Sequence, residues 1–410
     1  MITLASSTHA FRNWTPAAGR LLCALLNRLD VGGVELTTPD GTTLNYGPGG
    51  APVGGGRAMP AVLTLRDWRV AGEALRGGDV AFAESYMEDR WDTPDLTQLL
   101  TVLAANQSSL ERAFYGHWWS RSLLRLKHFL NVNTKLQARR NIRAHYDLGN
   151  DFYRLWLDPS MTYSSGLFDG RFEQSLVAAQ AAKYARLLAE LRLPPGKRIL
   201  EIGCGWGGFA QAAARAGHHV TGISLSDAQT EYARARLAAA GLASRTELRI
   251  QDYRDVHETY DGIASIEMFE AVGERFWPAY FRTVHDALRT GGRACIQTIT
   301  IADDRFERYR TQSDFIQQYI FPGGMLASPA RFVDVARAAG LELERVHTFG
   351  RDYAETLKRW LVAFDARTPA IRALGFEERF IRCWRFYLAY CAAGFETGTT
   401  DVGQYTFVRS

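Results

Sequence analysis

Long apolar runs are missing from this chain of 410 residues: none reaches the roughly 18 consecutive apolar residues that span a bilayer. Residues 1–9 also lack the charged and apolar regions of a signal peptide, so we expect a cytoplasmic protein. The five cysteines show neither metal-ligand spacing nor a disulfide framework, which fits a reducing compartment, and no metal is expected. A formal charge of +4 is too small to argue for nucleic acid.

Acidic residues are absent between Glu111 and Asp147. The same segment interleaves basic residues (Arg112, Arg121, Arg125, Lys127, Lys135, Arg139, Arg140, Arg143) with aromatic ones (Phe114, Tyr115, Trp118, Trp119, Phe129). Basic residues beside tryptophans suit an anionic membrane surface. They also suit single-stranded nucleic acid, whose bases stack on aromatic rings. A solvated helix face with core aromatics explains the pattern equally well, so all three interpretations stay open.

Glycine, by contrast, is concentrated at positions 203, 205, 207 and 208, directly after the apolar run 199–202. The run indicates a buried strand, and 209–216 has helix-forming composition. Glycines let the backbone turn tightly and let a ligand approach the main chain. The pattern therefore predicts a nucleotide-type cofactor loop, although a tight packing turn is the simpler alternative.

An acid in this motif distinguishes between cofactors. The dinucleotide fingerprint has an acid about 20 residues further on, near the end of the second strand. Here that strand, expected over 219–225, ends in hydroxyls, while Glu201 precedes the glycines. A carboxylate there suits an amino-acid ammonium or a ribose, which favours S-adenosylmethionine over NAD. A mere packing turn would leave the acid and the hydroxyls unexplained.

From about residue 196 the pattern predicts an α/β, Rossmann-like, doubly wound sheet. We expect strands at 198–203, 219–225, 246–251, 261–267 and 293–300, helices at 207–216, 227–240 and 276–289, and late strands at 341–349 and 403–409, the last antiparallel. The helical stretches 303–340 and 353–395 are lid insertions of the kind that covers a substrate.

A small α+β domain is expected before the sheet. Its predicted elements are an amphipathic helix at 20–29, a hairpin at 34–44, a loop at 47–60, a strand at 61–65 and helices near 66–76, 79–87 and 94–105. The predicted division is an N-terminal domain over 1–110, a basic linker over 111–145 and a cofactor-binding domain over 146–410.

Acids also follow the third and fourth predicted strands. Asp252, or the backbone beside it, can meet an adenine amino group, and Glu267 and Glu270 straddle the end of the fourth strand. Ligands bind at this edge of such sheets. A carboxylate in this position is either a base or an ion-pair partner, and the spacing leaves both roles open.

A series of motifs resembles the cyclopropane fatty-acyl-phospholipid synthases. They are Tyr146-Asp-Leu-Gly-Asn-Asp-Phe-Tyr153, Leu157-Asp-Pro-Ser-Met-Thr-Tyr-Ser164, Glu201-Ile-Gly-Cys-Gly-Trp-Gly-Gly208, Gln251-Asp-Tyr-Arg-Asp255, Met268-Phe-Glu-Ala-Val-Gly273, Tyr319-Ile-Phe-Pro-Gly-Gly324 and Tyr387-Leu-Ala-Tyr-Cys-Ala-Ala-Gly-Phe395. The likeness runs in order from about residue 140 to the C-terminus. The N-terminal region resembles that family's lipid-binding domain.

This resemblance implies a class I methyltransferase that moves the methyl of S-adenosylmethionine to the cis double bond of a phospholipid acyl chain. Proton loss from the resulting carbocation closes a cyclopropane ring. The resemblance also implies an enzyme at the inner face of the membrane, with phospholipid and not nucleic acid as its partner; a homodimer stays open.

The site residues follow from the glycine turn and the resemblance together. S-adenosylmethionine is expected to bind through Glu201, Gly203, Gly205, Ser224, Gln229 and Asp252, with Tyr163 and Ser164 closing over its methionine end. In the family a bound bicarbonate takes the proton, and its holders match Glu270, Tyr353 and the loop of Ser164 and Ser165. The predicted catalytic set is therefore Glu270, Tyr353, Gln297 and Ser165.

Departures from the family pattern fall in the catalytic set. Ser165 and Gln297 stand where a cysteine and a histidine are common, and Ala271 replaces a histidine often seen after Glu270. A serine and a glutamine still hydrogen-bond an oxyanion, but neither adds charge nor easily shuttles a proton. The departures resemble relatives that make methylene- or methyl-branched chains, so methyl transfer is better supported than ring closure.

Two other functions compete with this one. A lipid-binding protein that retains a degenerate methyltransferase fold is disfavoured by the intact glycine turn with Glu201, Asp252, Glu270 and Tyr353. A methyltransferase acting on a small soluble substrate is disfavoured by the long hydrophobic insertions and by the basic, aromatic segment.

Overall fold

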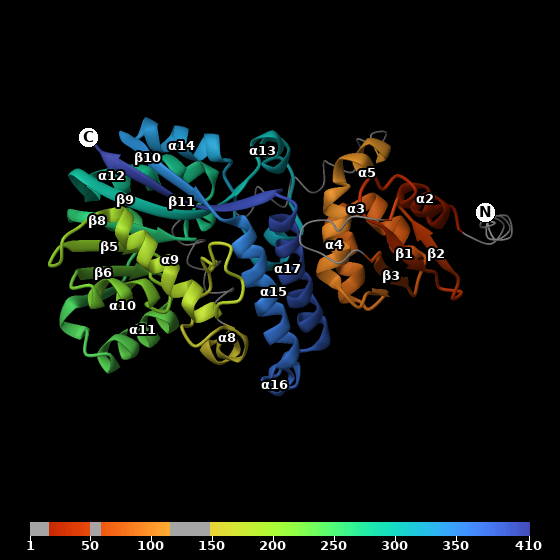
Figure 1. Cartoon of the computed structure of the whole chain (residues 1–410), viewed down its shortest axis with the longest axis horizontal. Helices are drawn as coiled ribbons and strands as arrows, with labels where there is room; N and C mark the ends of the chain where they lie inside the picture. Colours follow the sequence, from red (N-terminus) through yellow and green to blue (C-terminus); the bar gives the residue numbers. More distant parts are fainter. Residues whose placement is uncertain (1–15, 50–58, 115–147) are drawn as a thin grey trace. The chain divides into compact units, whose positions relative to one another are not determined.

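The computed structural model describes residues 16–49, 59–114 and 148–410, which form two compact units (Figure 1). The small unit comprises the described residues up to 114 together with Phe376–Thr397, and the large unit the described residues from 148 to Gly375 together with Gly398–Ser410. The predicted basic linker lies almost wholly outside the described residues. None of the described helices has the length and apolar character needed to cross a membrane.

Seven strands form the sheet of the large unit, in the order β10-β11-β9-β8-β5-β6-β7. They are β5 (Arg198–Ile202), β6 (His219–Ser224), β7 (Thr246–Ile250), β8 (Tyr260–Ile266), β9 (Leu288–Ile301), β10 (Leu341–Thr348) and β11 (Thr400–Arg409). Strands β5 to β9 pair in parallel, while β11 runs antiparallel to both β9 and β10. This confirms the predicted doubly wound α/β fold and its antiparallel last strand.

The order of the strands reverses at β5, because β6 and β7 lie on one side of it and β8 and β9 on the other. In open α/β sheets, ligands bind outside the carboxyl ends of the strands at such a reversal. The topology therefore places a ligand site at the end of β5, which is where the glycine turn begins.

Helices cover both faces of this sheet (Figure 1). The α-helices described in the large unit are α8 (Asn150–Trp156), α9 (Leu176–Leu191), α10 (Gly208–Arg215), α11 (Asp227–Ala239), α12 (Trp277–Ala287), α13 (Asp303–Tyr309), α14 (Pro329–Ala338), α15 (Gly350–Ala366) and α16 (Thr368–Ala373). One core cluster joins α12 and α14 to the sheet through Phe281 and Phe332. The other joins α9 and α10 to the sheet through Leu187 and Phe209.

The small unit has a sheet of its own, in the order β2-β1-β3-β4. Its strands are β1 (Val34–Thr37), β2 (Thr43–Tyr46), β3 (Ala61–Leu65) and β4 (Trp91–Asp92), and its helices α2 (Ala17–Leu26), α3 (Arg69–Met87), α4 (Leu96–Ala105), α5 (Gln107–Phe114) and α17 (Glu378–Glu396). The predicted hairpin is β1 and β2. The two helices predicted at 66–76 and 79–87 form α3, which has a kink at Gly78, where φ is 63°.

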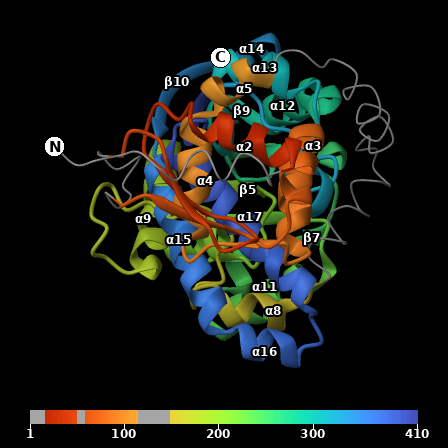
Figure 2. The ribbon, with the colours of Figure 1, turned by 90° about the vertical axis from the view of Figure 1, so that its right-hand side faces the viewer.

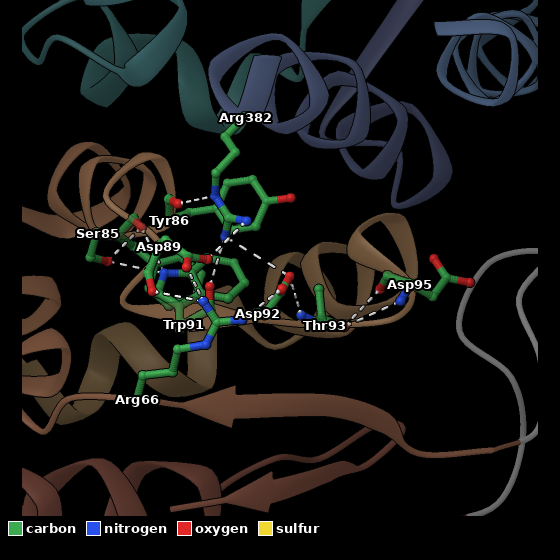
Figure 3. Close-up of polar contacts among 10 residues, drawn as sticks. Arg66, Ser85, Tyr86, Asp89, Trp91, Asp92, Thr93, Asp95 and Arg382 are labelled. Atoms are coloured by element: carbon green, nitrogen blue, oxygen red, sulfur yellow. Dashed lines mark hydrogen bonds and ion pairs between the residues drawn. The ribbon is translucent and has the colours of Figure 1, made fainter. Parts of the chain in front are cut away.

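Helix α17 belongs to the small unit, although it follows most of the large unit in sequence; it packs on α3 and α4 (Figure 2). Its buried Arg382 binds the turn between α3 and β4: Nε donates to the Tyr86 carbonyl at 2.5 Å, and Nη2 donates to the Trp91 carbonyl at 2.9 Å (Figure 3). Nη1 lies 3.1 Å from Asp89, and the guanidinium lies 3.9 Å from the centre of the Tyr86 ring.

This arrangement differs from the division expected from sequence, which placed 353–395 in the cofactor-binding domain as a lid over the substrate. The structure keeps α15 and α16 in the large unit but groups Phe376–Thr397 with the small one. The physical reason is the buried guanidinium, which needs acceptors, and the α3–β4 turn supplies them. We therefore do not assign α17 to the lid.

Candidate active site

A cavity lies at the carboxyl ends of β5, β6 and β8, where the strand order reverses. Every residue predicted to bind the cofactor lines it: Tyr163, Ser164, Glu201, Gly203, Gly205, Ser224, Gln229 and Asp252. They come from the loop before α9, from β5 with its glycine turn, from β6, from α11 and from the loop after β7. Residues from Tyr163 to Asp252, which are 89 positions apart in the sequence, thus surround one space.

The glycine turn needs its glycines for two different reasons. Gly203 and Gly205 both have positive φ, 85° and 49°. A Cβ on Gly203 would lie 2.8 Å from Cγ of Met268, so packing forbids it. A Cβ on Gly205 would meet no atom within 4 Å. Gly205 therefore borders open cavity space, and its missing side chain leaves room for a ligand.

Glu201 at the end of β5 is buried, with 3% of its surface exposed. Its Oε2 is enclosed and has no hydrogen-bond partner among the described residues. Burial raises the pKa of this carboxyl well above its ordinary value, against the opposing influence of the Ala210 N–H and the cations of Lys183 and Arg236. An unpartnered carboxyl oxygen on a cavity wall needs a donor. An ammonium or ribose hydroxyl of S-adenosylmethionine supplies one, so the site fits that cofactor.

Two polar residues in or beside the cavity are engaged within the chain. Ser226, which does not line the cavity, caps α11 by accepting from the Gln229 N–H at 3.3 Å, so its role is structural. The Asp252 carboxylate accepts from the Arg254 backbone at 3.0 Å and from its guanidinium at 2.8 and 2.6 Å. Because this pairing occupies the carboxylate, the backbone beside Asp252 becomes the better partner for an adenine.

The loop of Tyr163 and Ser164 is fixed from two sides. Oγ of Ser164 lies 2.5 Å from Nζ of Lys183, and the Ser164 carbonyl accepts from Gln180 at 2.8 Å. The Tyr163 ring lies 5.3 Å from that of Trp360. It is part of an aromatic cluster from α8 and α15 that contains Phe152, Tyr153, Trp156, Trp360 and Phe364. This aromatic cluster therefore adjoins the cofactor cavity through Tyr163.

Three of the four predicted catalytic residues, Ser165, Gln297 and Tyr353, donate hydrogen bonds to one carboxylate. That carboxylate belongs to Glu267 and not to Glu270, the fourth predicted residue. Oε1 of Glu267 accepts from the Ser165 backbone N–H at 2.9 Å and from Nε2 of Gln297 at 2.7 Å. Oε2 accepts from the Tyr353 hydroxyl at 2.6 Å. Glu267 also lines the cofactor cavity, whereas Glu270 does not. Sequence reasoning had named Glu267 but had left it out of the catalytic set.

Glu270 turns toward the backbone of β9. Its Oε1 accepts from the Ile299 N–H at 2.5 Å and from the Thr298 hydroxyl at 3.0 Å, while Oε2 is buried without a partner in the described part of the chain. Burial, and next the charge of Glu267, raise the pKa of Glu270 to about 8. This upward shift of the pKa favours the protonated form of Glu270, and Glu270 forms its hydrogen bonds with Ile299 and Thr298 instead of with Tyr353 and Gln297.

Two buried residues of this site were not predicted. Lys183 on α9 is fully buried, and burial lowers its pKa to about 7 despite the nearby acids Glu267, Asp158 and Glu201. Gln404 on β11 donates to Oε1 of Gln297 at 3.1 Å, which directs the Gln297 amide group toward Glu267. A weak signal existed in each case, because Lys183 follows two alanines in the alanine-rich α9 and Gln404 lies between Gly403 and Tyr405 in the buried part of β11.

The sheet topology, the glycine turn and the unpartnered acid at the end of β5 define a class I S-adenosylmethionine-dependent methyltransferase. Residues 133–405, more than half of the chain, match the family model described as mycolic acid cyclopropane synthetase, and the chain belongs to this family. The prediction of an enzyme of the cyclopropane and methyl-branching type is confirmed at this level.

Named relatives agree with the family assignment. The chain is 39% identical over 373 residues to a tuberculostearic acid methyltransferase of Mycobacterium tuberculosis, covering 89% of this chain and 87% of the relative. It is 31% identical over 353 residues to the cyclopropane-fatty-acyl-phospholipid synthase of Escherichia coli, covering 86% and 89%. A solved mycolic acid cyclopropane synthase, complexed with SAH and CTAB, is 32% identical with a TM-score of 0.61, covering 66% of this chain and 98% of that one.

Proposed function

We propose that this enzyme methylates the cis double bond of an unsaturated phospholipid acyl chain and releases a proton to form a cyclopropane ring. The carrying observation is a partly buried, hydrogen-bonded carboxylate, Glu267, on the wall of the cofactor cavity. Methylation of an alkene leaves a carbocation that must lose a proton, and a carboxylate in a water-poor site beside the cofactor meets that need.

Other residues of the chain would bind the cofactor, align the substrate and exclude water. Glu201, Ser224 and Gln229 would hold S-adenosylmethionine, which when bound supplies an electrophilic methyl group to the alkene. Because an alkene is a weak nucleophile, alignment by the fixed loop of Tyr163 and Ser164 contributes much of the rate. The aromatic cluster around Trp360 excludes water and offers ring faces that stabilise a cation.

A phospholipid substrate is supported by the Escherichia coli relative, whose name states that substrate and whose alignment covers 86% of this chain. It is further supported by the basic, aromatic segment over 112–143, most of which lies outside the described residues.

Attraction to anionic lipid is worth about 1 kcal/mol per basic residue near the surface and is screened by salt. Binding to anionic vesicles should therefore fall as salt rises, and fall again in the double variant Arg139→Glu, Arg140→Glu. Equal sedimentation with neutral vesicles at every salt concentration would contradict this part.

A methylene-branched acyl chain is the second candidate product. Gln297 in place of a histidine, together with the relative named as a tuberculostearic acid methyltransferase, favours it. In this outcome a hydride moves to the cationic carbon first. The added methyl then loses its proton and forms a carbon–carbon double bond in place of the ring. Both products add one CH2 group to the acyl chain, so mass alone does not separate them.

The test is incubation of the purified protein with methyl-labelled S-adenosylmethionine and vesicles of cis-unsaturated or fully saturated phospholipid. Label in the acyl chains of the unsaturated lipid alone supports the proposal. Ozone then cleaves a methylene product and leaves a cyclopropane intact, which separates the two candidates. Label in the head group, or label in a metabolite extract with none in the lipid, would contradict the proposal.

A further inference from the structure

The groups that the family resemblance assigns to a bicarbonate already hold another oxyanion in this chain. The Ser165 N–H, the Gln297 amide and the Tyr353 hydroxyl lie within 2.9 Å of the two oxygens of one carboxylate, Glu267. A carboxylate has about four lone-pair sites, and these donors use three. A bicarbonate beside them would find these donors already engaged by Glu267, and the negative charge of that carboxylate would repel it. The residues present do not fit bicarbonate.

We propose that Glu267 is the base of the reaction, and that this enzyme needs no bicarbonate because its own carboxylate fills that place. The inference rests on the proposed function, since it concerns the proton that leaves the methylated acyl chain. In the step, a C–H bond of the added methyl breaks and its electron pair closes the third bond of the ring. The proton goes to the remaining lone pair of Glu267.

Glu267 and Glu270, the two acids after the end of β8, differ in their position relative to the cofactor cavity. Glu267 lines the cofactor cavity, and Glu270 does not. The titratable groups facing Glu267 come from several elements: Lys183 on α9, which favours the ionised carboxylate, the Tyr353 hydroxyl on α15, and Glu270 after β8. Burial raises the pKa of Glu267 above its ordinary value, which strengthens it as a base, while Lys183 and the three donors limit that rise.

The backbone at this position is unusual as well. Glu267 has φ of 49°, in the left-handed region that non-glycine residues seldom occupy. Its N–H is fixed by the Gln297 carbonyl at 2.8 Å. Strain of this kind persists where the surrounding structure imposes it and gathers at functional sites. It also makes glycine a well-tolerated replacement, because glycine adopts this conformation without cost.

The experiment compares wild type with Glu267→Gly in buffer purged of carbon dioxide, with and without added sodium bicarbonate, and with sodium chloride at matched ionic strength. Conversion of unsaturated phospholipid is the rate measured, and calorimetry follows S-adenosylmethionine binding. Asp169→Gly is the matched control, since Asp169 is an exposed acid with φ of 53° that does not line the cavity.

We expect wild type and Asp169→Gly to convert lipid equally with and without bicarbonate. Glu267→Gly should bind S-adenosylmethionine but convert lipid about a hundredfold or more slowly in purged buffer, as loss of a general base does. Bicarbonate, and not chloride, should restore part of that rate by entering the emptied cradle of donors.

The proposal is overturned if wild type loses activity in purged buffer and regains it with bicarbonate, or if Glu267→Gly keeps the wild-type rate there. A wild type that converts no unsaturated lipid in either buffer would refute the proposed function itself. That result is distinct from lipid conversion that depends on bicarbonate.

Discussion

The charged groups around Arg382 in the small unit and those near the cavity of the large unit differ in how completely they are paired. In the small unit the buried Arg382 has its guanidinium shared between the carbonyls of Tyr86 and Trp91, the carboxylate of Asp89 and the face of the Tyr86 ring. In the large unit, Glu201 and Glu270 each keep a buried oxygen without a partner among the described residues. There, burial also lowers the pKa of Lys183 to about 7.

Complete pairing is expected of a buried charge that stabilises the fold, and incomplete pairing of a charge that binds a ligand or exchanges a proton. A fully paired buried cation fixes one helix in one place, and removing it leaves its acceptors unsatisfied. Incompletely paired groups cost stability, and they have a use only when a ligand or a proton completes them. In the large unit such groups follow the ends of β5 and β8: Glu201 lines the cofactor cavity, and Glu270 lies beside it in the chain segment after β8.

The largest effect should come from filling the cavity without disturbing any packing. Gly205→Val places a side chain where no atom lies within 4 Å of the added Cβ, so we expect S-adenosylmethionine binding and methyl transfer to be lost. Gly241→Val is the matched control, because Gly241 also has positive φ and open space but does not line the cavity. Both variants carry a similar backbone strain of about 1–2 kcal/mol. Calorimetry showing wild-type affinity in Gly205→Val would contradict the assignment.

A second, smaller effect should appear in the small unit. Arg382→Met leaves two carbonyls and an acid without their buried partner, so we expect the local free energy of unfolding to fall by about 2–4 kcal/mol. Hydrogen exchange of α17 and α4 measures this. Arg379→Met on the same helix removes a half-exposed ion pair with Glu88, and should cost only about 0–1 kcal/mol. Equal losses of protection in the two variants would show that Arg382 is not the residue that anchors the helix.

The smallest effect concerns pH and sharpens the role of Lys183. Protonated Lys183 lowers the pKa of Glu267, so Lys183→Met should raise that pKa. Since the reaction needs ionised Glu267, activity is lost as pH falls through this pKa, and the acid limb of the rate profile should move to higher pH. The shift should arise below about pH 7, where Lys183 carries its charge. Rates are measured at saturating S-adenosylmethionine, because Lys183 also contacts Ser164; an unmoved acid limb would contradict the coupling.

The cofactor site could be predicted from the sequence because its determinants are local. A strand, an acid and glycines within the eleven residues from Arg198 to Gly208 fix a turn at a sheet edge, and every predicted cofactor residue lines the cavity. The sequence near Glu267 and Glu270 does not show which of the two meets Ser165, Gln297 and Tyr353. The choice between them depends on one left-handed residue and on the register that pairs Ile266 with Gln297.

Partners distant in the sequence explain what else was missed. Lys183 faces Glu267 only once α9 packs on the sheet, and Gln404 reaches Gln297 only through the antiparallel pairing of β11 with β9. The place of α17 depends likewise on Arg382 meeting a turn almost three hundred residues earlier. Periodicity predicts that such a segment is a helix but not which core it completes.

The placement of α17 has a consequence for how the chain is made. Ribosomes deliver residues in order, at roughly 5–20 per second, so on the order of ten to fifty seconds separate the synthesis of α4 from that of α17. During that interval the apolar surfaces of α3 and α4 remain uncovered by α17, which has not yet been translated. The small unit, first to leave the ribosome, therefore completes its core only near the end of translation, after the strands β5 to β10 have emerged.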